Sequence, residues 1–272
     1  MKKLLFGIFA HPDDEAFGPG GALIKAVHEG VELHLITLTL GQNGTNPDNA
    51  PDLGTVRREE WLKSGQMMGA TSQHELGYID GRLCNIEMLE IAEKIQQIVH
   101  EAITDRDVEV EFMGFDLNGL TGHIDHIVAT RALCLAFYRL RQNDSRFIRI
   151  RLFCLPAEQN PHVNTDWIYM EAGRAPEQID ETIDAREYHD QIIQIMHAHH
   201  SQRGDAETQI HALGRDIGRR VIHDGADQPH LAGDGGVVQL LVLEHGAGLE
   251  VVPQAEGVAD LVHGHFLDSL LN

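Results

Sequence analysis

Apolar and polar residues along positions 4–155 form blocks whose lengths and spacings are typical of alternating strands and helices. The run Leu4–Ala10 is continuously apolar, which is typical of a strand that is covered on both faces. The predicted strands are Leu4–Ala10, Val31–Leu40, Glu75–Ile79, Val108–Phe115 and Arg149–Leu155. The predicted helices are Ala22–Glu29, Val56–Met68, Ile86–Ile103, Ile127–Arg141 and Arg186–His200. This order predicts βαβ units and therefore an α/β fold with a mostly parallel sheet and helices on both faces.

The last third of the chain follows this pattern less well. From Arg203 to His265 the sequence has many glycines and no Phe, Tyr or Trp. Val237–Leu243 is a strand candidate, and Leu249–Val252 is a weaker one. We therefore predict one domain over residues 1–202 and a C-terminal extension of uncertain structure over residues 203–272, packed on the same domain.

The composition is that of a globular protein of 272 residues, with 42% hydrophobic and 23% charged residues. Lys and Arg number 21 against 42 Asp and Glu, so the formal net charge is −21 at pH 7. A surface this acidic repels phosphate backbones and anionic bilayers. We therefore expect neither nucleic acid nor an anionic membrane surface as a partner.

Cysteine usage and hydropathy bear on the cellular location. Cys84, Cys134 and Cys154 are far apart and form no Cys-x-x-Cys pair, so we expect small buried apolar groups in a reducing compartment. The apolar run Leu4–Ala10 ends at a polar cluster without a small-residue cleavage site, which favours a buried strand over a signal peptide. No segment reaches the length of a membrane span. We expect a cytoplasmic protein.

Ionisable side chains follow two of the predicted strands. The segment Ala10-His11-Pro12-Asp13-Asp14-Glu15 comes directly after the first strand, and the segment 118–126 follows Val108–Phe115. The carboxyl ends of parallel strands lie at one edge of the sheet. We therefore expect the two polar segments to meet there.

Taken alone, each segment has a simpler explanation. Asp13 or Asp14 could cap a following helix, and His123 and His126 could be surface or core residues. Together, two histidines and one aspartate from the two segments supply the three protein ligands of a catalytic zinc site. Adjacent carboxylates beside an imidazole are also costly unless a cation is present. The combination favours a metal site.

These motifs resemble those of the PIG-L/LmbE-like de-N-acetylases, zinc-dependent enzymes that act on N-acetylglucosaminyl compounds. The resemblance runs from Lys3 to Gln202. It rests on Ala10-His11-Pro12-Asp13-Asp14-Glu15 and Gly122-His123-Ile124-Asp125-His126, supported by Gly41-Gln42, Val56-Arg57-Arg58-Glu59-Glu60, Leu76-Gly77-Tyr78-Ile79-Asp80-Gly81 and His199-His200-Ser201-Gln202. It implies a Rossmann-like fold.

The resemblance also implies a ligand set and a base. His11, Asp14 and His126 match the metal ligands, with Zn²⁺ as the expected metal, although other divalent ions suit the same donors. Asp13 matches the general base. Because it is not a ligand in this interpretation, its oxygens are free to take a proton from water.

Three further residues take roles by the same resemblance. His123 matches the residue that stabilises the oxyanion when protonated, and Asp125 matches the residue that orients it. Asp125 would also raise the pKa of His123. Arg57 matches a substrate-binding position, but it could instead form a surface ion pair with Glu60. Either Asp13 or His123 could return the proton to the leaving amine.

Several residues keep two interpretations. Asp80 could cap a turn or contact substrate, and His199 and Ser201 could be structural or functional. The chain after Gln202 departs from the family pattern, and we consider it as an extension, a lid or an oligomer contact, the last of which would make the protein a homo-oligomer.

We predict a hydrolase that removes an acetyl group from a small N-acetylated sugar or sugar conjugate. One alternative is a metal-dependent amidase that acts on a non-sugar amide. The other is a non-catalytic metal- or nucleotide-binding α/β module, although no Gly-x-Gly-x-x-Gly follows the first strand.

Overall fold

The protein is described by a computed structural model, in which residues 1–157 and 173–224 are placed. The strands are β1 (Lys2–Phe9), β2 (Glu32–Thr39), β3 (Ser72–Tyr78), β4 (Val108–Phe115), β5 (Phe147–Cys154), β6 (Glu181–Asp184) and β7 (Arg219–Asp224). The helices are α1 (Asp14–Phe17), α2 (Gly20–His28), α3 (Leu53–Met68), α4 (Asn85–Ile103), α5 (Gly119–Gly122), α6 (Ile124–Arg141), α7 (His189–Ala198) and α8 (Arg203–Leu213). Short 3₁₀ turns cover Pro176–Gln178, Arg186–Tyr188, His200–Gln202 and Gly214–Gly218.

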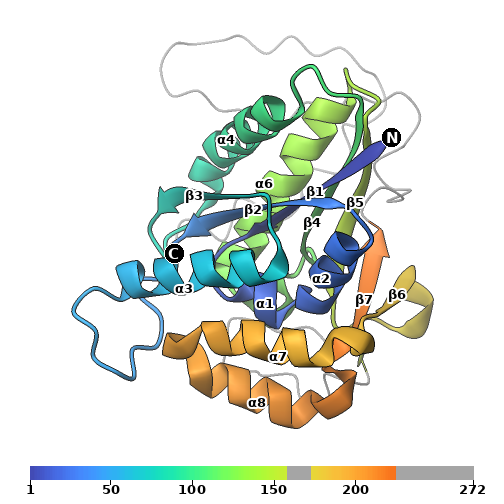
Figure 1. The fold of residues 1–272 in the computed structure, drawn as a ribbon. Coiled ribbons are helices and arrows are strands. Elements are labelled where there is room, and N and C mark those ends of the chain that lie inside the picture. Colours follow the sequence, from blue (N-terminus) through green and yellow to red (C-terminus); the bar gives the residue numbers. More distant parts are fainter. Residues whose placement is uncertain (158–172, 225–272) are drawn as a thin grey trace, which may run out of the picture. The chain divides into compact units, whose positions relative to one another are not determined.

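The described strands form one mixed sheet in the order β3-β2-β1-β4-β5-β7-β6 (Figure 1). Strand β1 pairs in parallel with β2 and β4, and β3 and β5 extend the parallel part on either side. Strand β7 runs antiparallel to both β5 and β6. This topology places the carboxyl ends of β1 and β4 side by side at one edge of the sheet.

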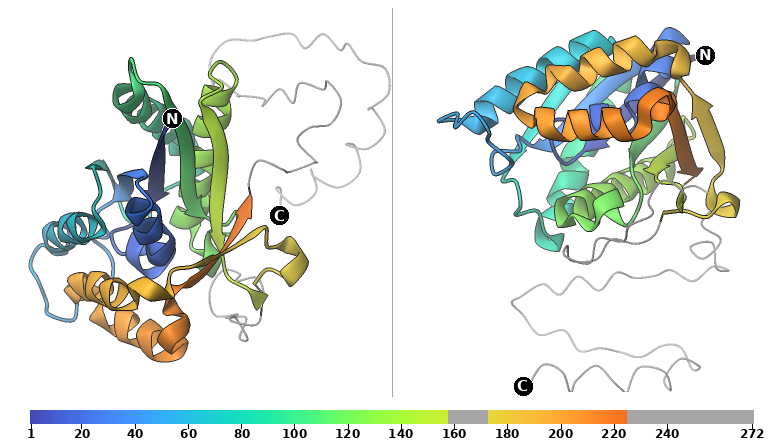
Figure 2. Two further views of the ribbon diagram at one scale, coloured as in Figure 1. Left: turned by 45° about the vertical axis from the view of Figure 1, so that its right-hand side comes forward. Right: turned by 90° about the horizontal axis from the view of Figure 1, so that it is seen from below.

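Strand β1 is buried on both sides because its apolar residues contribute to two separate cores. Leu4, Phe6 and Ile8 pack with α4 and α6 on one face of the sheet. Leu5 and Phe9 pack with α2, α3 and α7 on the other face. Figure 2 shows the two helix layers around the sheet. The predicted α/β fold, with helices on both faces of a mostly parallel sheet, is confirmed.

Within the described residues each predicted strand and helix occurs, and most of their ends shift by one to three residues. The helix predicted over Arg186–His200 is shorter, because only His189–Ala198 is α-helical and a 3₁₀ turn lies at either end. Helix α6 starts at Ile124 rather than at Ile127, because Asp125 and His126 form its first turn. Helix α3 starts at Leu53, where the Asp52 side chain accepts a hydrogen bond from the Thr55 backbone nitrogen.

The C-terminal prediction is tested only in part. Helix α8 and strand β7, which follow residue 202, belong to the same compact unit, Met1–Gln228. The proposed strands Val237–Leu243 and Leu249–Val252 lie outside the described residues. The boundary at residue 202 and the homo-oligomer therefore stay predictions.

Two further expectations concern the cysteines and the membrane. Cys154 is buried and Cys134 is half-buried, but Cys84 is exposed, so the expectation of three buried thiols is wrong for Cys84. Cys84 precedes α4 at its amino end, where its side chain is not covered. Among the described residues, no helix combines the length and the apolar character needed to cross a bilayer.

Candidate active site

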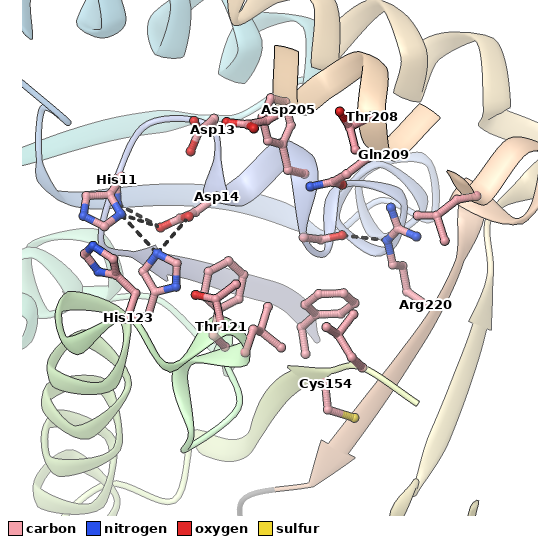
Figure 3. A pocket seen from close by; sticks show the side chains of 18 of the residues that line it. His11, Asp13, Asp14, Thr121, His123, Cys154, Asp205, Thr208, Gln209 and Arg220 are labelled. Atoms are coloured by element: carbon pink, nitrogen blue, oxygen red, sulfur yellow. Dashed lines mark hydrogen bonds and ion pairs between the residues drawn. The ribbon is translucent and has the colours of Figure 1, made fainter. Parts of the chain in front are cut away.

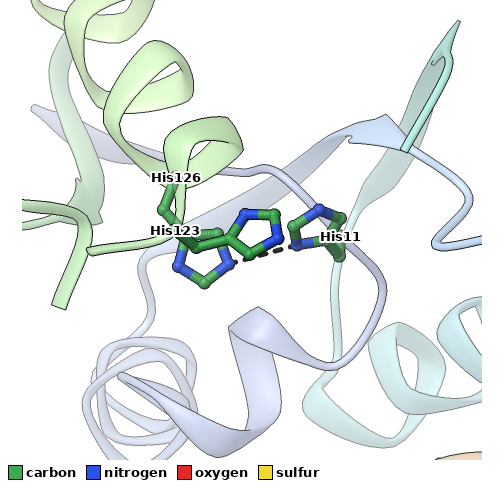
Figure 4. Close-up of side chains that lie close together, drawn as sticks. All are labelled: His11, His123 and His126. Carbon is green, nitrogen blue, oxygen red and sulfur yellow. Dashed lines mark hydrogen bonds between the residues drawn. The ribbon is translucent and has the colours of Figure 1, made fainter. Parts of the chain in front are cut away.

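Three histidine rings meet where β1 and β4 end. His11 follows β1, and His123 and His126 lie at the start of α6 (Figure 4). The centroids of the rings are 5.0 Å apart in each of the three pairs. The two polar segments therefore meet at the sheet edge, as the strand order predicts.

The two nitrogens of His11 face different groups. Nε2 lies 3.0 Å from Asp80 Oδ1 and 3.3 Å from Asp125 Oδ2. Nδ1 lies 3.1 Å from His126 Nε2. Burial disfavours the imidazolium, but hydrogen bonds to Asp125, Asp14 and Asp80 outweigh it and hold the pKa of His11 well above its usual value. The carboxylates keep a proton on Nε2, and Nδ1 is turned toward His126.

His126 has the complementary arrangement. Its Nδ1 donates a hydrogen bond to the Gly119 carbonyl oxygen at 3.0 Å, which assigns the ring proton to that nitrogen. Its Nε2 therefore presents a lone pair toward His11 Nδ1 and lies 3.3 Å from Asp14 Oδ1. A proton on His11 Nδ1 bridges these two nitrogens in the protein alone, and a cation that replaced this proton would be held by both nitrogens beside a carboxylate.

Asp14 is the acidic member of this group. Its Oδ2 accepts a hydrogen bond from the His11 backbone nitrogen at 2.9 Å and lies 3.6 Å from His11 Nδ1. Burial opposes ionisation, but the neighbouring His126 and His11 outweigh it and hold the pKa of Asp14 far below its usual value. The carboxylate is therefore ionised at neutral pH.

The spacing of these donor atoms fits a tetrahedral zinc site. Nitrogen and oxygen ligands lie about 2.0–2.2 Å from zinc, so two ligand atoms at the tetrahedral angle are about 3.3–3.5 Å apart. His11 Nδ1 and His126 Nε2 are 3.1 Å apart, and they face different oxygens of Asp14, at 3.6 Å from Oδ2 and 3.3 Å from Oδ1 respectively. Within the described residues, two groups have one donor atom from each residue within 4.8 Å of the others: His11 with His123 and His126, and His11 with Asp80 and Asp125.

Asp13 stands beside this group in a strained conformation. Its φ of 94° lies in the left-handed region that a non-glycine residue rarely adopts. Arg57 Nη2 donates to Asp13 Oδ2 at 2.8 Å, and Arg57 also bonds the carbonyl oxygens of Pro12 and Gly41. Burial raises the pKa of Asp13 to about 6 against the opposing charge of Arg57. The side chain makes no helix-capping hydrogen bond, so capping does not explain this residue.

The Glu15 side chain holds the backbone of Asp13 by a hydrogen bond. Its Oε2 accepts the Asp13 backbone N–H at 3.1 Å. Its Oε1 accepts hydrogen bonds from Ser64 Oγ at 2.6 Å and from His199 Nε2 at 2.7 Å. Glu15 and His199 are almost completely buried. The strained conformation of Asp13 is therefore held by a buried ionic network that reaches α3 and the end of α7.

His123 and Asp125 are less directly connected than the sequence suggests. The Asp125 carboxylate contacts His11 and accepts the backbone N–H groups of Gly81 at 2.7 Å and Leu83 at 3.2 Å. The charge of Asp125 does favour protonation of His123, but burial and the neighbouring histidines dominate and lower the pKa of His123. The assignment of Asp125 as the residue that orients His123 stays a prediction.

The candidate site opens into a cavity of about 630 Å³, which is within the usual size range of small-molecule sites. The side chains of His11, Asp13, Asp14, Arg57, His123 and His126 line one end of this cavity. Its walls continue over aromatic and aliphatic side chains toward α8 and β7 (Figure 3). All the predicted site residues except Asp125 border the cavity, and Asp125 lies directly behind His11.

Sequence reasoning left two supporting residues unassigned. Asp80 lies against His11, and the end of β3 at the same sheet edge was a signal for that position. His199 lies against Glu15, and no local pattern indicates that contact. Ser201 donates to Glu60 Oε2 at 2.6 Å, which indicates a structural role and removes Glu60 as the expected surface partner of Arg57.

Comparison with known proteins agrees with the motifs. Residues 6–137 match the family described as PIG-L, GlcNAc-PI de-N-acetylase. Over residues 6–137 the chain is therefore similar to the PIG-L family. The matched residues contain both histidine segments.

Relatives of this chain include two bacterial proteins, both named 1D-myo-inositol 2-acetamido-2-deoxy-α-D-glucopyranoside deacetylase. The Acidothermus cellulolyticus protein is 27% identical over 81% of this chain and 86% of its own length. The Streptomyces scabiei protein is 30% identical over 46% of this chain, and the match spans only 45% of that relative's length. Several curated relatives are therefore matched over about half of their length.

A solved structure supports the architecture. The N,N′-diacetylchitobiose deacetylase from Pyrococcus horikoshii superposes with a TM-score of 0.57 over 82% of this chain and 81% of its own. Its sequence identity of 18% shows a common fold and no more.

Proposed function

We propose that this chain is a metal-dependent hydrolase that removes the acetyl group from an N-acetylglucosaminyl compound. The observation that carries the proposal is the pair of imidazole nitrogens, His11 Nδ1 and His126 Nε2, that face each other at 3.1 Å beside Asp14. We assign these three residues as the metal ligands, with Zn²⁺ as the metal. The family match and the deacetylase names of the relatives supply the reaction class.

When bound, a divalent ion supplies Lewis acidity that activates water and polarises the amide carbonyl. Asp13 then acts as the general base, because it borders the cavity beside the ligands and is not itself a ligand. Arg57 holds one Asp13 oxygen at 2.8 Å and leaves the other for the proton. The substrate contact predicted for Arg57 remains part of the proposal, since its side chain also lines the cavity.

His123 is placed to donate a hydrogen bond to the amide oxygen as negative charge develops there. A lowered pKa does not remove this role, since a neutral imidazole still carries one N–H donor. Asp80 and Asp125 act through His11, because their carboxylates fix its ring and its tautomer.

The decisive experiment measures free-amine release from N-acetylglucosamine and its conjugates, with acyl amino acids as the non-sugar comparison. The full chain is assayed as purified, after treatment with a chelator, and after Zn²⁺ is restored. We expect release from the sugar compounds that chelation abolishes and Zn²⁺ restores. Release from acyl amino acids alone would establish the amidase alternative, and bound metal without any release would favour a binding module.

The role of Asp13 is tested by Asp13→Asn, which keeps the size of the side chain and removes the base. We expect bound metal to stay at one per chain and turnover to fall by about 10²–10⁴-fold. Asp190→Asn is the matched control, because the Asp190 side chain is 97% exposed. Metal loss in Asp13→Asn would contradict the separation of base and ligands.

A further inference from the structure

Arg220 is a buried cation on the wall of the same cavity, at the end opposite His11 (Figure 3). The residue is only 3% exposed. Its Nε donates to the Gly18 carbonyl oxygen at 2.6 Å, and its Nη1 donates to the Arg219 carbonyl oxygen at 3.3 Å. Among the side chains that the structure describes, none accepts a hydrogen bond from its Nη2 and no carboxylate pairs with its charge.

An unpaired buried guanidinium is costly to fold. Burial lowers the pKa of Arg220 to about 10, so the group is still a cation at neutral pH. A structural role in holding Gly18 needs only a neutral donor at Nε. It does not explain a full positive charge with a free amino group at a cavity wall.

One wall between the histidines and Arg220 is apolar, whereas Thr208 and Gln209 of α8 also line the cavity (Figure 3). Contacts between rings lead from His126 to Phe115 at 4.9 Å and from Phe115 to Phe153 at 6.2 Å between centroids. Arg220 Cζ then lies 5.8 Å from the Phe153 centroid. Leu120, Leu155 and Val221 line the same stretch. A molecule that spans the cavity would therefore contact the candidate metal site at one end, the apolar wall in the middle and the Arg220 guanidinium at the other end.

We propose that Arg220 binds a carboxylate carried by the substrate, at the far end of an apolar segment that begins at the scissile amide. The proposal rests on the proposed function, whose site supplies the other end of the cavity. A monoanionic carboxylate matches one guanidinium that has a single free amino group. A phosphate dianion would leave excess negative charge in a largely apolar wall.

The carboxylate could be attached on either side of the amide, and two substrate series distinguish the sides. In one series, N-acetylglucosaminides carry alkyl aglycones of increasing length that end in a carboxylate. In the other, glucosamine is N-acylated with alkanoyl chains that end in a carboxylate. Each compound has a neutral carboxamide counterpart of equal length, and kcat/KM is measured for both members of every pair.

We expect the wild-type chain to favour the carboxylate by about tenfold or more at one chain length in one series. Arg220→Met should bring that ratio to about one, and Arg220→Lys should keep part of it. Arg186→Met is the control, since exposed Arg186 pairs with Asp184 away from the cavity, and it should leave the ratio unchanged. Because every variant is compared on paired substrates, partial loss of folded protein cancels in the ratio.

Two results would overturn the proposal while amine is still released. One is a wild-type ratio near one at every length in both series, and the other is a ratio that Arg220→Met leaves intact. Release of no amine from any compound would instead contradict the proposed function. Calorimetric binding of the same pairs to chelator-treated protein then tests Arg220 by itself, with equal affinities for carboxylate and carboxamide counting against it.

Discussion

His199 donates a hydrogen bond to Glu15 at 2.7 Å across 184 residues of sequence, in a contact that solvent does not reach. The other Glu15 oxygen accepts the Asp13 backbone N–H. Burial disfavours the His199 cation, but the adjacent Glu15 outweighs it and raises the pKa of His199. Through Glu15, a residue 184 positions later in the chain supports the backbone conformation of the proposed base.

Replacement of His199 tests this connection. His199→Ala leaves a buried carboxylate with Ser64 and one backbone donor, so we expect the free energy of unfolding to fall by about 3 kcal/mol. We also expect kcat to fall by at least about tenfold, with bound metal unchanged, because Asp13 loses the support of its strained backbone. Denaturant unfolding, metal analysis and the amine-release assay measure the three quantities.

The matched control is His197→Ala, which breaks the exposed pair between His197 and Glu207. Exposed ion pairs contribute little, so this variant should keep the wild-type stability and kcat. Equal losses in both variants would show that the buried pair has no special role.

Gly41 is required by the close approach of Arg57. Gly41 has a φ of 61°, and a Cβ there would overlap the Arg57 guanidinium. In Gly41→Ala the guanidinium must move away from Asp13, so we expect at least about a tenfold loss of kcat. The left-handed conformation should also lower the free energy of unfolding by about 1–3 kcal/mol.

Gly30→Ala separates these two effects. Gly30 has a φ of 87°, but no atom lies within 4 Å of a Cβ built there. This variant should lose a similar amount of stability and keep its kcat. If Gly30→Ala and Gly41→Ala lose activity equally, the contact with Arg57 is not the cause.

The sequence predicts the centre of the fold and of the site because both follow from local patterns. Strand β4 has the predicted bounds Val108–Phe115, since its alternating valines and the apolar residues after them are bounded by Asp107 and Asp116. His11 and His126 meet because each follows a parallel strand and the two strands are neighbours. The start of α6 was missed because its first turn carries Asp125 and His126, whose polar character resembles that of a loop.

Long-range contacts were not predictable in the same way. The pairing of Glu15 with His199 depends on how α7 packs against α1 and α3, which no periodic pattern records. The unpaired charge of Arg220 likewise appears only when β7 joins the sheet next to β5 and brings the residue against Phe153. The sequence thus left His199 and Arg220 unassigned, because their contacts form only when distant elements pack together.

Glu32 gives a pH-dependent contribution to stability. Hydrogen bonds from Arg106, opposed by partial burial and helped by Lys2, lower the pKa of Glu32 from 4.5 to about 2. A folded pKa below the unfolded one stabilises the protein above about pH 4.5, and this stability is lost as the pH falls toward 2. We expect Glu32→Gln to reduce the free energy of unfolding by about 1–2 kcal/mol at pH 7, after allowance for the exposure of its partners.

The difference between wild type and Glu32→Gln should shrink as the pH is lowered from 5 to 3, which denaturant unfolding at several pH values measures. Glu29→Gln is the control, because Glu29 forms an exposed pair with Lys25. That variant should match wild type throughout. A Glu32→Gln difference that stays constant with pH would rule out ionisation as its source.

Asp80 provides a test of metal affinity that leaves the proposed ligands intact. Its Oδ1 lies 3.0 Å from His11 Nε2, and its Oδ2 accepts the Asn43 backbone N–H at 2.9 Å. Asp80→Asn keeps the shape and the bond to Asn43 but removes the negative charge that fixes the His11 tautomer. Because such supporting carboxylates tune ligand basicity, we expect Zn²⁺ affinity to fall by about 10–100-fold, measured by competition with a chelator.

Asp48→Asn changes a carboxylate that pairs with Arg203 on the surface, and it should leave the Zn²⁺ affinity unchanged. The comparison also distinguishes the two ways in which His11 could face an ion. If Asp80 were itself a ligand together with Asp125, its replacement would abolish binding of stoichiometric Zn²⁺ instead of weakening it. Retained but weaker binding in Asp80→Asn, with full binding in Asp48→Asn, therefore supports the arrangement in which His11 Nδ1 faces the metal and Nε2 faces its supporting carboxylates.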